Sequence, residues 1–311
     1  MRVVYMGTPD FAVPALEALC DGGYEVTLVV TTPDKPVGRK QILTPSAVKT
    51  AALGRGLPVY QPKTLKTDEA YERIRAEAPD FIVVAAYGKI LPQRVLDIPR
   101  YGAINIHGSL LPKYRGAAPI QRSVIDGEAQ TGLTIMRMDA GLDTGDILRP
   151  LVYPIGENET AGEVFDALAA LSGKLLTETL PDVAAGRIVP VKQDDSLSTY
   201  ASMLTKDEAV IDWTRPAQAI HDKIRGMDPW PVAVTTMRGK RVKLRQSRMT
   251  DQRSGKAPGT LIAENGRLYC VCGDGRLLEL TQIQPEGAKN MESKAFLAGH
   301  DPDGIILGRD D

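Results

Sequence analysis

Two patterns of hydrophobic and polar residues alternate along the first half of the chain. Short apolar runs rich in valine and isoleucine indicate buried strands. Between them, apolar residues recur every three or four positions, as on one face of an amphipathic helix. Phe81–Ala86 is continuously apolar, which is typical of a parallel strand buried on both faces. We predict strands at Arg2–Met6, Glu25–Thr31, Phe81–Ala86, Ala103–His107, Thr131–Met138 and Ile147–Ile155, and helices at Phe11–Leu19, Ser46–Leu53, Asp68–Glu77 and Ala161–Leu180.

This alternation predicts an α/β fold, a doubly wound Rossmann-like sheet with helices on both faces. Ligands of such sheets bind at the carboxyl ends of the strands, where the strand order reverses. We therefore expect the functional residues of this domain directly after its strands.

The pattern changes in the second half of the chain. Residues 190–206 are polar without an apolar period, and we interpret them as an interdomain linker. A predicted helix at Pro216–Arg225 then precedes five short strands, which indicate a small OB-like β-barrel. The predicted domains are residues 1–189 and 207–311, and the predicted C-terminal strands are 232–236, 241–247, 259–263, 268–272 and 277–284.

Length and composition fit two globular domains. The chain has 311 residues, of which 43% are hydrophobic and 25% charged. Its longest apolar run, Phe81–Ala86, is far shorter than the roughly 18 residues that span a bilayer. The N-terminus lacks the pattern of a secretory signal, and the three cysteines lack nearby metal-ligand partners. We expect a cytoplasmic, monomeric protein without a metal, with Cys270 and Cys272 on one face of a strand.

A basic segment stands out against the net charge of −1. Residues 238–256 hold eight lysines and arginines and one acid. Arg241, Lys243 and Arg245 alternate with Val242 and Leu244, so a strand here would have one cationic and one apolar face. Such a face suits a nucleic-acid backbone, although the same pattern also protects an edge strand from aggregation. The pattern alone leaves both interpretations open.

The turn after the first strand argues against a dinucleotide enzyme. It reads Gly7-Thr-Pro-Asp-Phe11, with one glycine, whereas a pyrophosphate-binding turn needs three so that the backbone can approach the phosphates. A nicotinamide enzyme is therefore disfavoured.

Asn105 and His107 are the first candidates for chemistry. Two positions apart at the end of a predicted strand, they project to the same side. An amide donor can stabilise an oxyanion, worth about 3 kcal/mol, and an imidazole can transfer protons near neutral pH. Turn capping is the plain alternative. Of the other two histidines, we expect His221 on an exposed helix and His300 near the polar C-terminus, so His107 is the favoured catalyst.

Asp143 is the third candidate. Gly141 and Gly145 flank it and predict a tight loop that could aim its carboxylate inward. Opposite a histidine, the carboxylate would stabilise an imidazolium. An ordinary turn between two strands is the alternative.

Together these segments resemble the 10-formyltetrahydrofolate-dependent formyltransferases. The matching motifs are Asn105-x-His107, the following Ser-Leu-Leu-Pro-Lys-Tyr-Arg-Gly, and Leu-Asp143-Thr-Gly-Asp. The resemblance implies a catalytic trio of Asn105, His107 and Asp143, and a formyl donor that is released as tetrahydrofolate. It also implies folate contacts from Ser109, Leu110, Leu111, Pro112, Tyr87, Gly88, Ile90 and Leu91.

Four further segments are similar to the branch of this superfamily that formylates methionyl-initiator tRNA. They begin at Gly7, Pro33, Leu204 and Arg225. Two departures are the short basic run at Arg39-Lys40-Gln-Ile and the junction Gly226-Met-Asp, where the family usually has Ala-Phe-Asn. The resulting hypothesis is direct transfer of the formyl group to the methionine amine, with tRNA contacts at Arg39, Lys40, Lys206, Arg241, Lys243 and Arg245.

Three alternatives remain at this point. A sibling enzyme could formylate an amino sugar nucleotide or another small amine. A folate hydrolase could use the same trio to release formate. A non-catalytic RNA-binding protein could carry an inactive copy of the domain, although the intact trio argues against it.

Overall fold

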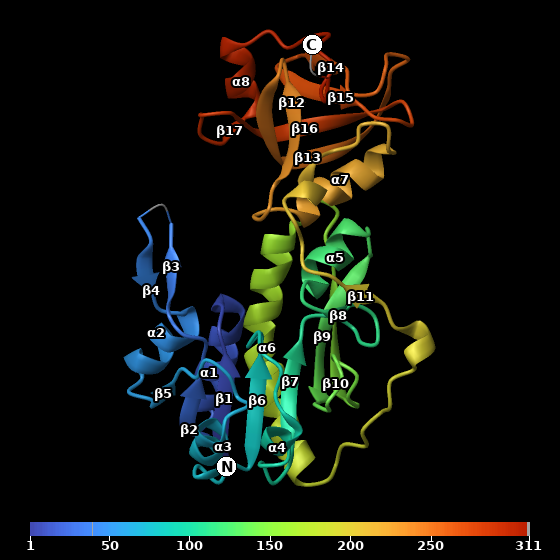
Figure 1. Cartoon of the computed structure of the whole chain (residues 1–311). Coiled ribbons are helices and arrows are strands. Elements are labelled where there is room, and N and C mark those ends of the chain that lie inside the picture. Colours follow the sequence, from blue (N-terminus) through green and yellow to red (C-terminus); the bar gives the residue numbers. More distant parts are fainter. Residues whose placement is uncertain (39, 310–311) are drawn as a thin grey trace. The chain divides into compact units, whose positions relative to one another are not determined.

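The computed structural model describes residues 1–38 and 40–309, which form two compact units (Figure 1). The N-terminal unit comprises residues 1–116, 131–153 and 165–200. The C-terminal unit comprises residues 117–130, 154–164 and 201–311. The chain leaves the N-terminal unit for the last time after Tyr200, inside the predicted linker. Residues 117–130 and 154–164 also belong to the C-terminal unit, whereas the sequence predicted them as part of the N-terminal domain.

A seven-stranded sheet forms the centre of the N-terminal unit, with strand order β10-β9-β7-β6-β1-β2-β5. The strands from β5 to β7 are parallel, whereas β9 runs antiparallel to β7, so the sheet is mixed. The strands are β1 (Arg2–Gly7), β2 (Glu25–Val30), β5 (Val59–Tyr60), β6 (Phe81–Ala85), β7 (Ala103–His107), β9 (Gln130–Arg137) and β10 (Ile147–Pro154).

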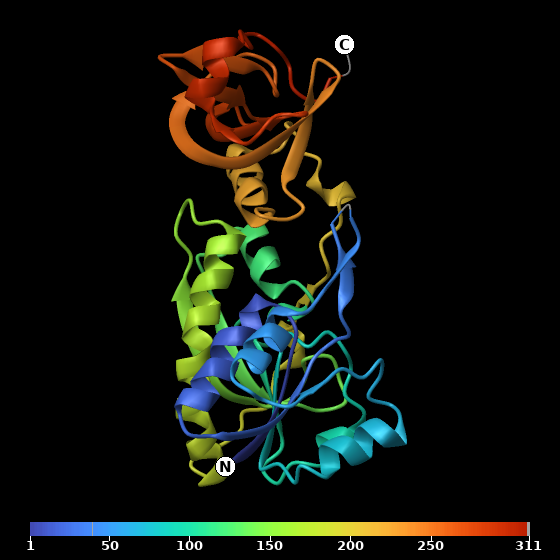
Figure 2. The same ribbon diagram turned by 90° about the vertical axis from the view of Figure 1, so that its left-hand side faces the viewer.

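Helices cover both faces of this sheet, as the α/β pattern predicted. Figure 2 shows the helices α1 and α6 on one face and α3 and α4 on the other. Ile74 of α3 packs into a core with Val4 and Ile82 of the sheet. Ser46 and Thr67 cap the starts of α2 and α3 by accepting from backbone N–H groups three residues on. The helices are η1 (Asp10–Ala12), α1 (Val13–Asp21), α2 (Ala47–Gly54), α3 (Asp68–Arg75), α4 (Gln93–Leu96) and α6 (Ala161–Ala184).

The strand order reverses at β1, which has β2 on one side and β6 on the other. Residues that follow β1 and β6 are joined there, because Thr8 Oγ1 donates to the Tyr87 carbonyl at 3.1 Å. This is the edge at which the sequence predicted a ligand site.

Two small pairs of strands lie outside the large sheet. Between β2 and α2, β3 (Lys35–Val37) and β4 (Ile42–Thr44) form an antiparallel hairpin. Strand β8 (Arg115–Gly116) pairs with β11 (Tyr200–Ala201). These strands have two or three residues each, which is too short for a hydrophobic period to reveal.

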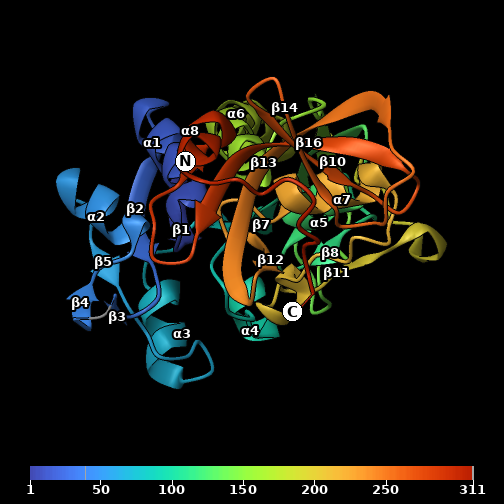
Figure 3. The same ribbon diagram turned by 90° about the horizontal axis from the view of Figure 1, so that it is seen from above.

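The C-terminal unit is built on an antiparallel sheet of order β12-β13-β16-β15-β14. Seen from above, its strands curve round (Figure 3). The five predicted strands are present, and β13 extends further than expected. Ile220, Leu244 and Phe296 belong to its hydrophobic core. The elements are α5 (Pro119–Ile125), η3 (Asp207–Ala209), α7 (Ala217–Gly226), β12 (Ala233–Met237), β13 (Lys240–Arg253), β14 (Leu261–Glu264), β15 (Arg267–Val271), β16 (Arg276–Pro285), β17 (Met291–Glu292) and α8 (Ser293–Gly299).

Cys270 and the following Cys272 are buried in this core as free thiols. Within residues 1–38 and 40–309, no cluster of three or more His, Cys, Asp or Glu side chains is arranged to hold a metal ion. No helix of that part of the chain has the length and apolar character needed to cross a membrane.

Candidate active site

Strand β7 carries Asn105 and His107 to the carboxyl end of the sheet. The strand lies between β6 and β9, and all five of its residues are buried. Asn105 is 8% exposed and His107 5% exposed. As alternate residues of a strand, they project to the same face. An amide and an imidazole are thus held side by side at the edge where ligands of this fold bind.

Both ring nitrogens of His107 face oxygen acceptors. Nε2 lies 2.8 Å from the carbonyl oxygen of Tyr114, and Nδ1 lies 3.7 Å from Asp143 Oδ2. A carbonyl only accepts, so Nε2 carries a hydrogen. A neutral ring then presents the lone pair of Nδ1 to the carboxylate, whereas an imidazolium donates towards both oxygens. This geometry suits a ring that gains and loses a proton during a reaction.

The Asp143 carboxylate is held in place by the loop between β9 and β10. Its Oδ2 accepts from the backbone N–H of Gly116 at 2.9 Å. Asp143 itself has φ of +53°, a left-handed conformation that aspartate tolerates better than most side chains. A Cβ at Gly145 would lie 1.7 Å from the Arg137 carbonyl oxygen, so only glycine fits. The predicted tight loop therefore exists and turns its carboxylate towards His107.

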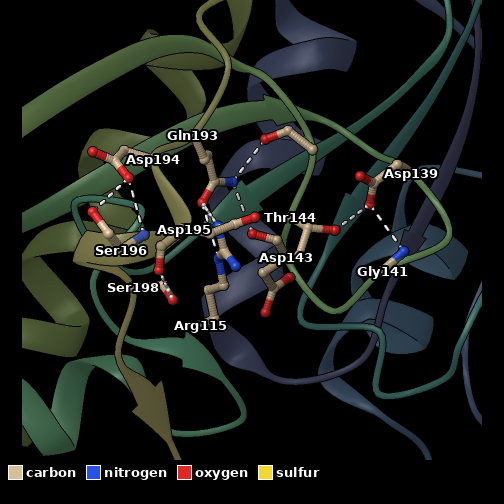
Figure 4. A network of polar contacts seen from close by, with 11 residues as sticks. Arg115, Asp139, Gly141, Asp143, Thr144, Gln193, Asp194, Asp195, Ser196 and Ser198 are labelled. Carbon is tan, nitrogen blue, oxygen red and sulfur yellow. Dashed lines mark hydrogen bonds and ion pairs between the residues drawn. The ribbon is translucent and has the colours of Figure 1, made fainter.

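Two sets of hydrogen bonds fix this loop (Figure 4). On one side, Asp139 Oδ1 accepts from Gly141 N at 3.0 Å and from Thr144 Oγ1 at 2.7 Å. On the other, Gln193 Nε2 donates to the carbonyl oxygens of Asp143 and Gly145 at 2.8 and 2.7 Å.

Gln193 is in turn held by Arg115. Its Oε1 accepts from Nε and Nη2 of Arg115 at 3.0 and 2.8 Å. Sequence reasoning missed both roles. Arg115 belongs to a motif that was noticed, but Gln193 lies in the polar segment 190–206 that we interpreted as a linker, and it carries no signal of its own.

The predicted folate residues fall into two turns. In the first, the Ser109 hydroxyl donates to the Lys113 carbonyl at 2.7 Å. Thr134 Oγ1 accepts from Leu111 N at 3.1 Å and donates to the Ser109 carbonyl at 2.6 Å. The turn that contains Leu110, Leu111 and Pro112 is thus pinned to β9, and the Ser109 hydroxyl donates its hydrogen within the turn.

The second turn follows β6. Tyr87 and Leu91 are 2% and 4% exposed and pack into the core, and burial raises the pKa of the Tyr87 hydroxyl to about 12. Gly88, with φ of +78°, and Ile90, which is 79% exposed, lie at the surface. At the surface of this turn a ligand would meet Gly88, Ile90 and the backbone, and the folate contacts of Tyr87 and Leu91 stay predictions.

The predicted tRNA residues belong to both units. Arg39 lies outside the described residues, and Lys40 is exposed in the turn after β3. Lys206 and Arg241 are exposed and line the same cavity of about 710 Å³ in the C-terminal unit. Lys243 is partly exposed on β13.

Strand β13 has the predicted alternation, with Val242 and Leu244 buried. Arg245, however, is not a free cation, because its Nη1 donates to Asp228 Oδ1 at 2.7 Å. Burial raises the pKa of the Asp228 carboxyl, while the Arg245 charge partly offsets that effect. Arg245 therefore ties β13 to the turn after α7, which weakens its assignment as a phosphate contact.

The prediction of an exposed His221 is wrong. The side chain is 1% exposed, with Nδ1 2.8 Å from Ser247 Oγ and Nε2 2.9 Å from the Glu157 carbonyl oxygen. Helix α7 packs against both β13 and α5, so the face that looked polar in sequence is also covered. Asp222 and Arg225 are buried beside it as an ion pair at 2.8 Å.

Comparison with known proteins agrees with this architecture. Residues 1–180 match the family model described as formyl transferase, and residues 203–301 match the formyl transferase C-terminal domain. The chain is 44% identical over 309 residues to the methionyl-tRNA formyltransferase of Bacillus subtilis, covering 99% of this chain and 98% of that protein. It is 45% identical over 298 residues to the methionyl-tRNA formyltransferase of Listeria innocua, covering 96% and 95%.

A solved structure shares the fold at low sequence identity. The N-formyltransferase from Helicobacter canadensis, in complex with folinic acid and dTDP-3-aminofucose, superposes with a TM-score of 0.68 at 18% identity, covering 91% of this chain and 98% of that one.

Proposed function

The chain belongs to the formyl transferase family, and from that premise we propose how it formylates methionyl-tRNA. It adds a formyl group to the α-amino group of methionine on the initiator tRNA, giving the N-formylmethionyl-tRNA used to start translation. The similarity to the Bacillus subtilis enzyme carries this conclusion, because the 44% identity extends over 99% of the chain and so over both units. The site of such an activity is the cytoplasm.

The donor in this proposal is 10-formyltetrahydrofolate, released as tetrahydrofolate. A folate derivative is bound in the related N-formyltransferase from Helicobacter canadensis, which supports a formyl-folate donor. In this chain, the turns at 86–91 and 109–112 follow β6 and β7 at the carboxyl edge of the sheet. Gly88 and Ile90 are exposed there, so we assign them and the backbone of both turns to the folate.

The chemistry is a direct transfer between two nitrogens. The methionine amine, with an ordinary pKa of about 7.7–8.0, is partly neutral near pH 7 and attacks the formyl carbon. A C–N bond to the methionine forms while the C–N bond to the folate breaks. Asn105 donates to the formyl oxygen as negative charge develops on it.

His107 moves the proton in this mechanism. The lone pair of its Nδ1 takes the proton that the attacking amine loses, and Nδ1 returns that proton to the folate nitrogen that leaves. Asp143, 3.7 Å from Nδ1, stabilises the imidazolium between these two events. The carbonyl of Tyr114 on Nε2 keeps the ring in one orientation.

The C-terminal unit, with residues 207–311 as its main part, is the proposed tRNA-binding domain. Lys206 and Arg241 on one cavity, with Lys243 two residues beyond Arg241 on β13, offer three cations to the tRNA backbone. Lys40 on the β3–β4 turn, with Arg39 beside it in sequence, is proposed to meet the acceptor stem. The protein acts as a monomer in this proposal.

One incubation tests the acceptor and the donor together. The protein is given formyl-labelled 10-formyltetrahydrofolate with methionyl-initiator tRNA, with a 3-amino sugar nucleotide, or with no acceptor. Label on the methionine of the tRNA, falling as salt is raised, is the expected result. Label on the sugar alone would overturn the proposal in favour of a sugar N-formyltransferase, and formate released without an acceptor would indicate a hydrolase.

A further inference from the structure

Gln193 is a buried amide in a segment with little other burial. It is 6% exposed, whereas the neighbouring residues from Val189 to Leu197 are exposed or half-buried. A bridge between Ile147 and Val191 holds the segment against β10. The mechanism proposed above uses no residue of this segment, so the buried amide needs a reason.

We infer that Gln193 is a positioning residue for the reaction, which fixes the backbone of the loop that carries Asp143. This inference rests on the proposed role of Asp143. Both amide hydrogens of Gln193 are used on the loop, one on the Asp143 carbonyl and one on the Gly145 carbonyl. The amide oxygen accepts twice from Arg115. Because carbonyls only accept and a guanidinium only donates, the amide has one satisfactory orientation.

Strand β8, with two residues, fixes both the carboxylate and the backbone carbonyl of Asp143. Gly116 of β8 donates to the carboxylate, and Arg115 of β8 orients the amide that grips the Asp143 carbonyl. Arg115 is itself tied into the unit through its backbone N–H, which donates to the Thr199 carbonyl at 2.9 Å. The side chain and the backbone of Asp143 are therefore both held by β8, the first directly and the second through Gln193. This sets the distance between the Asp143 carboxylate and Nδ1 of His107.

The loop needs such a constraint because Asp143 adopts a left-handed conformation, with φ of +53°. A non-glycine residue in this region persists when its surroundings over-determine it. If the carbonyls of Asp143 and Gly145 lose their donors, the loop can relax and carry the carboxylate away from Nδ1 of His107. A misplacement of about 1 Å near reacting groups costs about 10²-fold in rate.

Gln193→Glu removes the donors and keeps the acceptor. The new carboxylate still accepts from Arg115 but turns a negative oxygen towards two carbonyl oxygens. We expect kcat for formyl transfer to fall about 10²-fold. KM for methionyl-tRNA and for the folate should change less than about threefold, because the amide of Gln193 is engaged by Arg115 and the loop carbonyls.

Asp194→Asn is the matched control. The side chain of this exposed neighbour accepts from the backbone N–H and the hydroxyl of Ser196, and the amide oxygen of asparagine can accept both bonds. We expect kcat to stay within about twofold of the wild type. Gln193→Asn serves as a second variant if Gln193→Glu fails to fold, since its amide is neutral and one methylene shorter. We expect it to lose about tenfold in kcat, and wild-type activity would overturn the inference.

A double-mutant cycle with Asp143→Asn separates positioning from general stability. If Gln193 acts through Asp143, Gln193→Glu costs less than about threefold once the carboxylate is gone. The pH profile of kcat should also change its shape in Gln193→Glu, because the charge opposite His107 has moved. An equal loss in both backgrounds, with an unchanged pH profile, would overturn the inference. A wild-type rate for Asp143→Asn alone would instead overturn the proposed role of Asp143, on which this inference rests.

Discussion

Two histidines of this protein are almost equally buried and have opposite surroundings. His107 ends strand β7 of the N-terminal unit, and His221 lies on α7 of the C-terminal unit, at 5% and 1% exposure. In both, Nε2 lies within 2.9 Å of a backbone carbonyl oxygen. The other nitrogen faces the Asp143 carboxylate in His107 and the Ser247 hydroxyl in His221.

The partner of Nδ1 decides what each ring can do. A carboxylate stabilises the charged ring, so His107 can take a proton and give it back. A hydroxyl accepts or donates without charge, and burial lowers the pKa of His221, which is kept neutral. Burial and hydrogen bonding are common to both rings, so neither property identifies a catalyst. The Asp143 carboxylate beside Nδ1 distinguishes the two rings, and the proposed role of His107 rests on it.

Replacement of His107 by glutamine should have the largest effect. The rate of formyl transfer should fall by about 10²–10⁴-fold, since the proton transfers lose their catalyst. The thermal midpoint should change little, because glutamine can still donate to the Tyr114 carbonyl. Single-turnover formylation of methionyl-tRNA measures the rate. A loss of only a few-fold would show that His107, like His221, is structural.

Asn105→Ala should follow, with a loss of about 10²–10³-fold in kcat. The amide supplies the hydrogen bond to the developing oxyanion, and alanine supplies none. Binding of tetrahydrofolate, followed by fluorescence or calorimetry, should be nearly unchanged. Weakened folate binding with an unchanged kcat would move Asn105 from chemistry to ligand recognition.

His221→Ala should affect stability instead of rate. The change leaves the Ser247 hydroxyl and the Glu157 carbonyl without a buried partner and opens a cavity, which costs about 2–4 kcal/mol of unfolding free energy. Both tryptophans, Trp213 and Trp230, belong to the C-terminal unit, so their fluorescence in urea follows this unit. Below the unfolding transition kcat should stay within a few-fold of the wild type. A large loss of kcat in folded His221→Ala would contradict the contrast between a catalytic His107 and a structural His221.

The pH dependence of stability should carry the signature of His221. Its pKa in the folded protein is lowered by burial, whereas the unfolded value is about 6.5. Between the two values the unfolded chain binds the proton and the folded chain does not. Its stabilising contribution is therefore complete above pH 6.5 and declines as the pH falls below it. Tryptophan fluorescence melts of wild type and His221→Gln, between about pH 7.5 and pH 5.5, should converge at the acid end. Parallel curves would contradict the assignment.

Lys243 and Arg245, both on β13, should differ in the same way, with smaller effects: Lys243 should affect tRNA binding and Arg245 should affect stability. Lys243→Ala should raise KM for the tRNA a few-fold and reduce the slope of log affinity against log salt by about 1. Arg245→Ala should mainly destabilise the C-terminal unit, because the half-buried Asp228 carboxylate loses its ion-pair partner. Filter binding at several salt concentrations, with urea unfolding, distinguishes the two. An equal salt slope change for both would show that Arg245 also contacts the tRNA.

The long elements of the fold could be predicted from sequence because each repeats one pattern over many residues. β7 was predicted at its observed bounds, and the five C-terminal strands were predicted near theirs. The antiparallel direction of β9 could not be predicted, since a buried strand has the same apolar run in either direction. The short strands β8 and β11, with two residues each, contain no period at all.

The arrangement of the candidate site could be predicted where its residues are close in sequence. Asn105 and His107 lie on one strand, so their shared face follows from alternation. Gln193 could not be found in this way. Its role depends on two carbonyl oxygens and a guanidinium from distant parts of the chain, and a lone glutamine in a polar stretch indicates only a surface. His221 was placed wrongly for the converse reason, because the helix face that covers it comes from other segments.

The most direct test of the account is the charge at position 143. Asp143→Asn keeps an oxygen to accept from Gly116 but removes the charge that faces His107. Asp139→Asn, on the same loop, keeps the acceptor for Gly141 and Thr144 and removes a charge that faces no catalytic group. Single-turnover formylation should be about 10²–10⁴-fold slower in the first variant and within about threefold of the wild type in the second. Equal rates in the two variants would contradict the account.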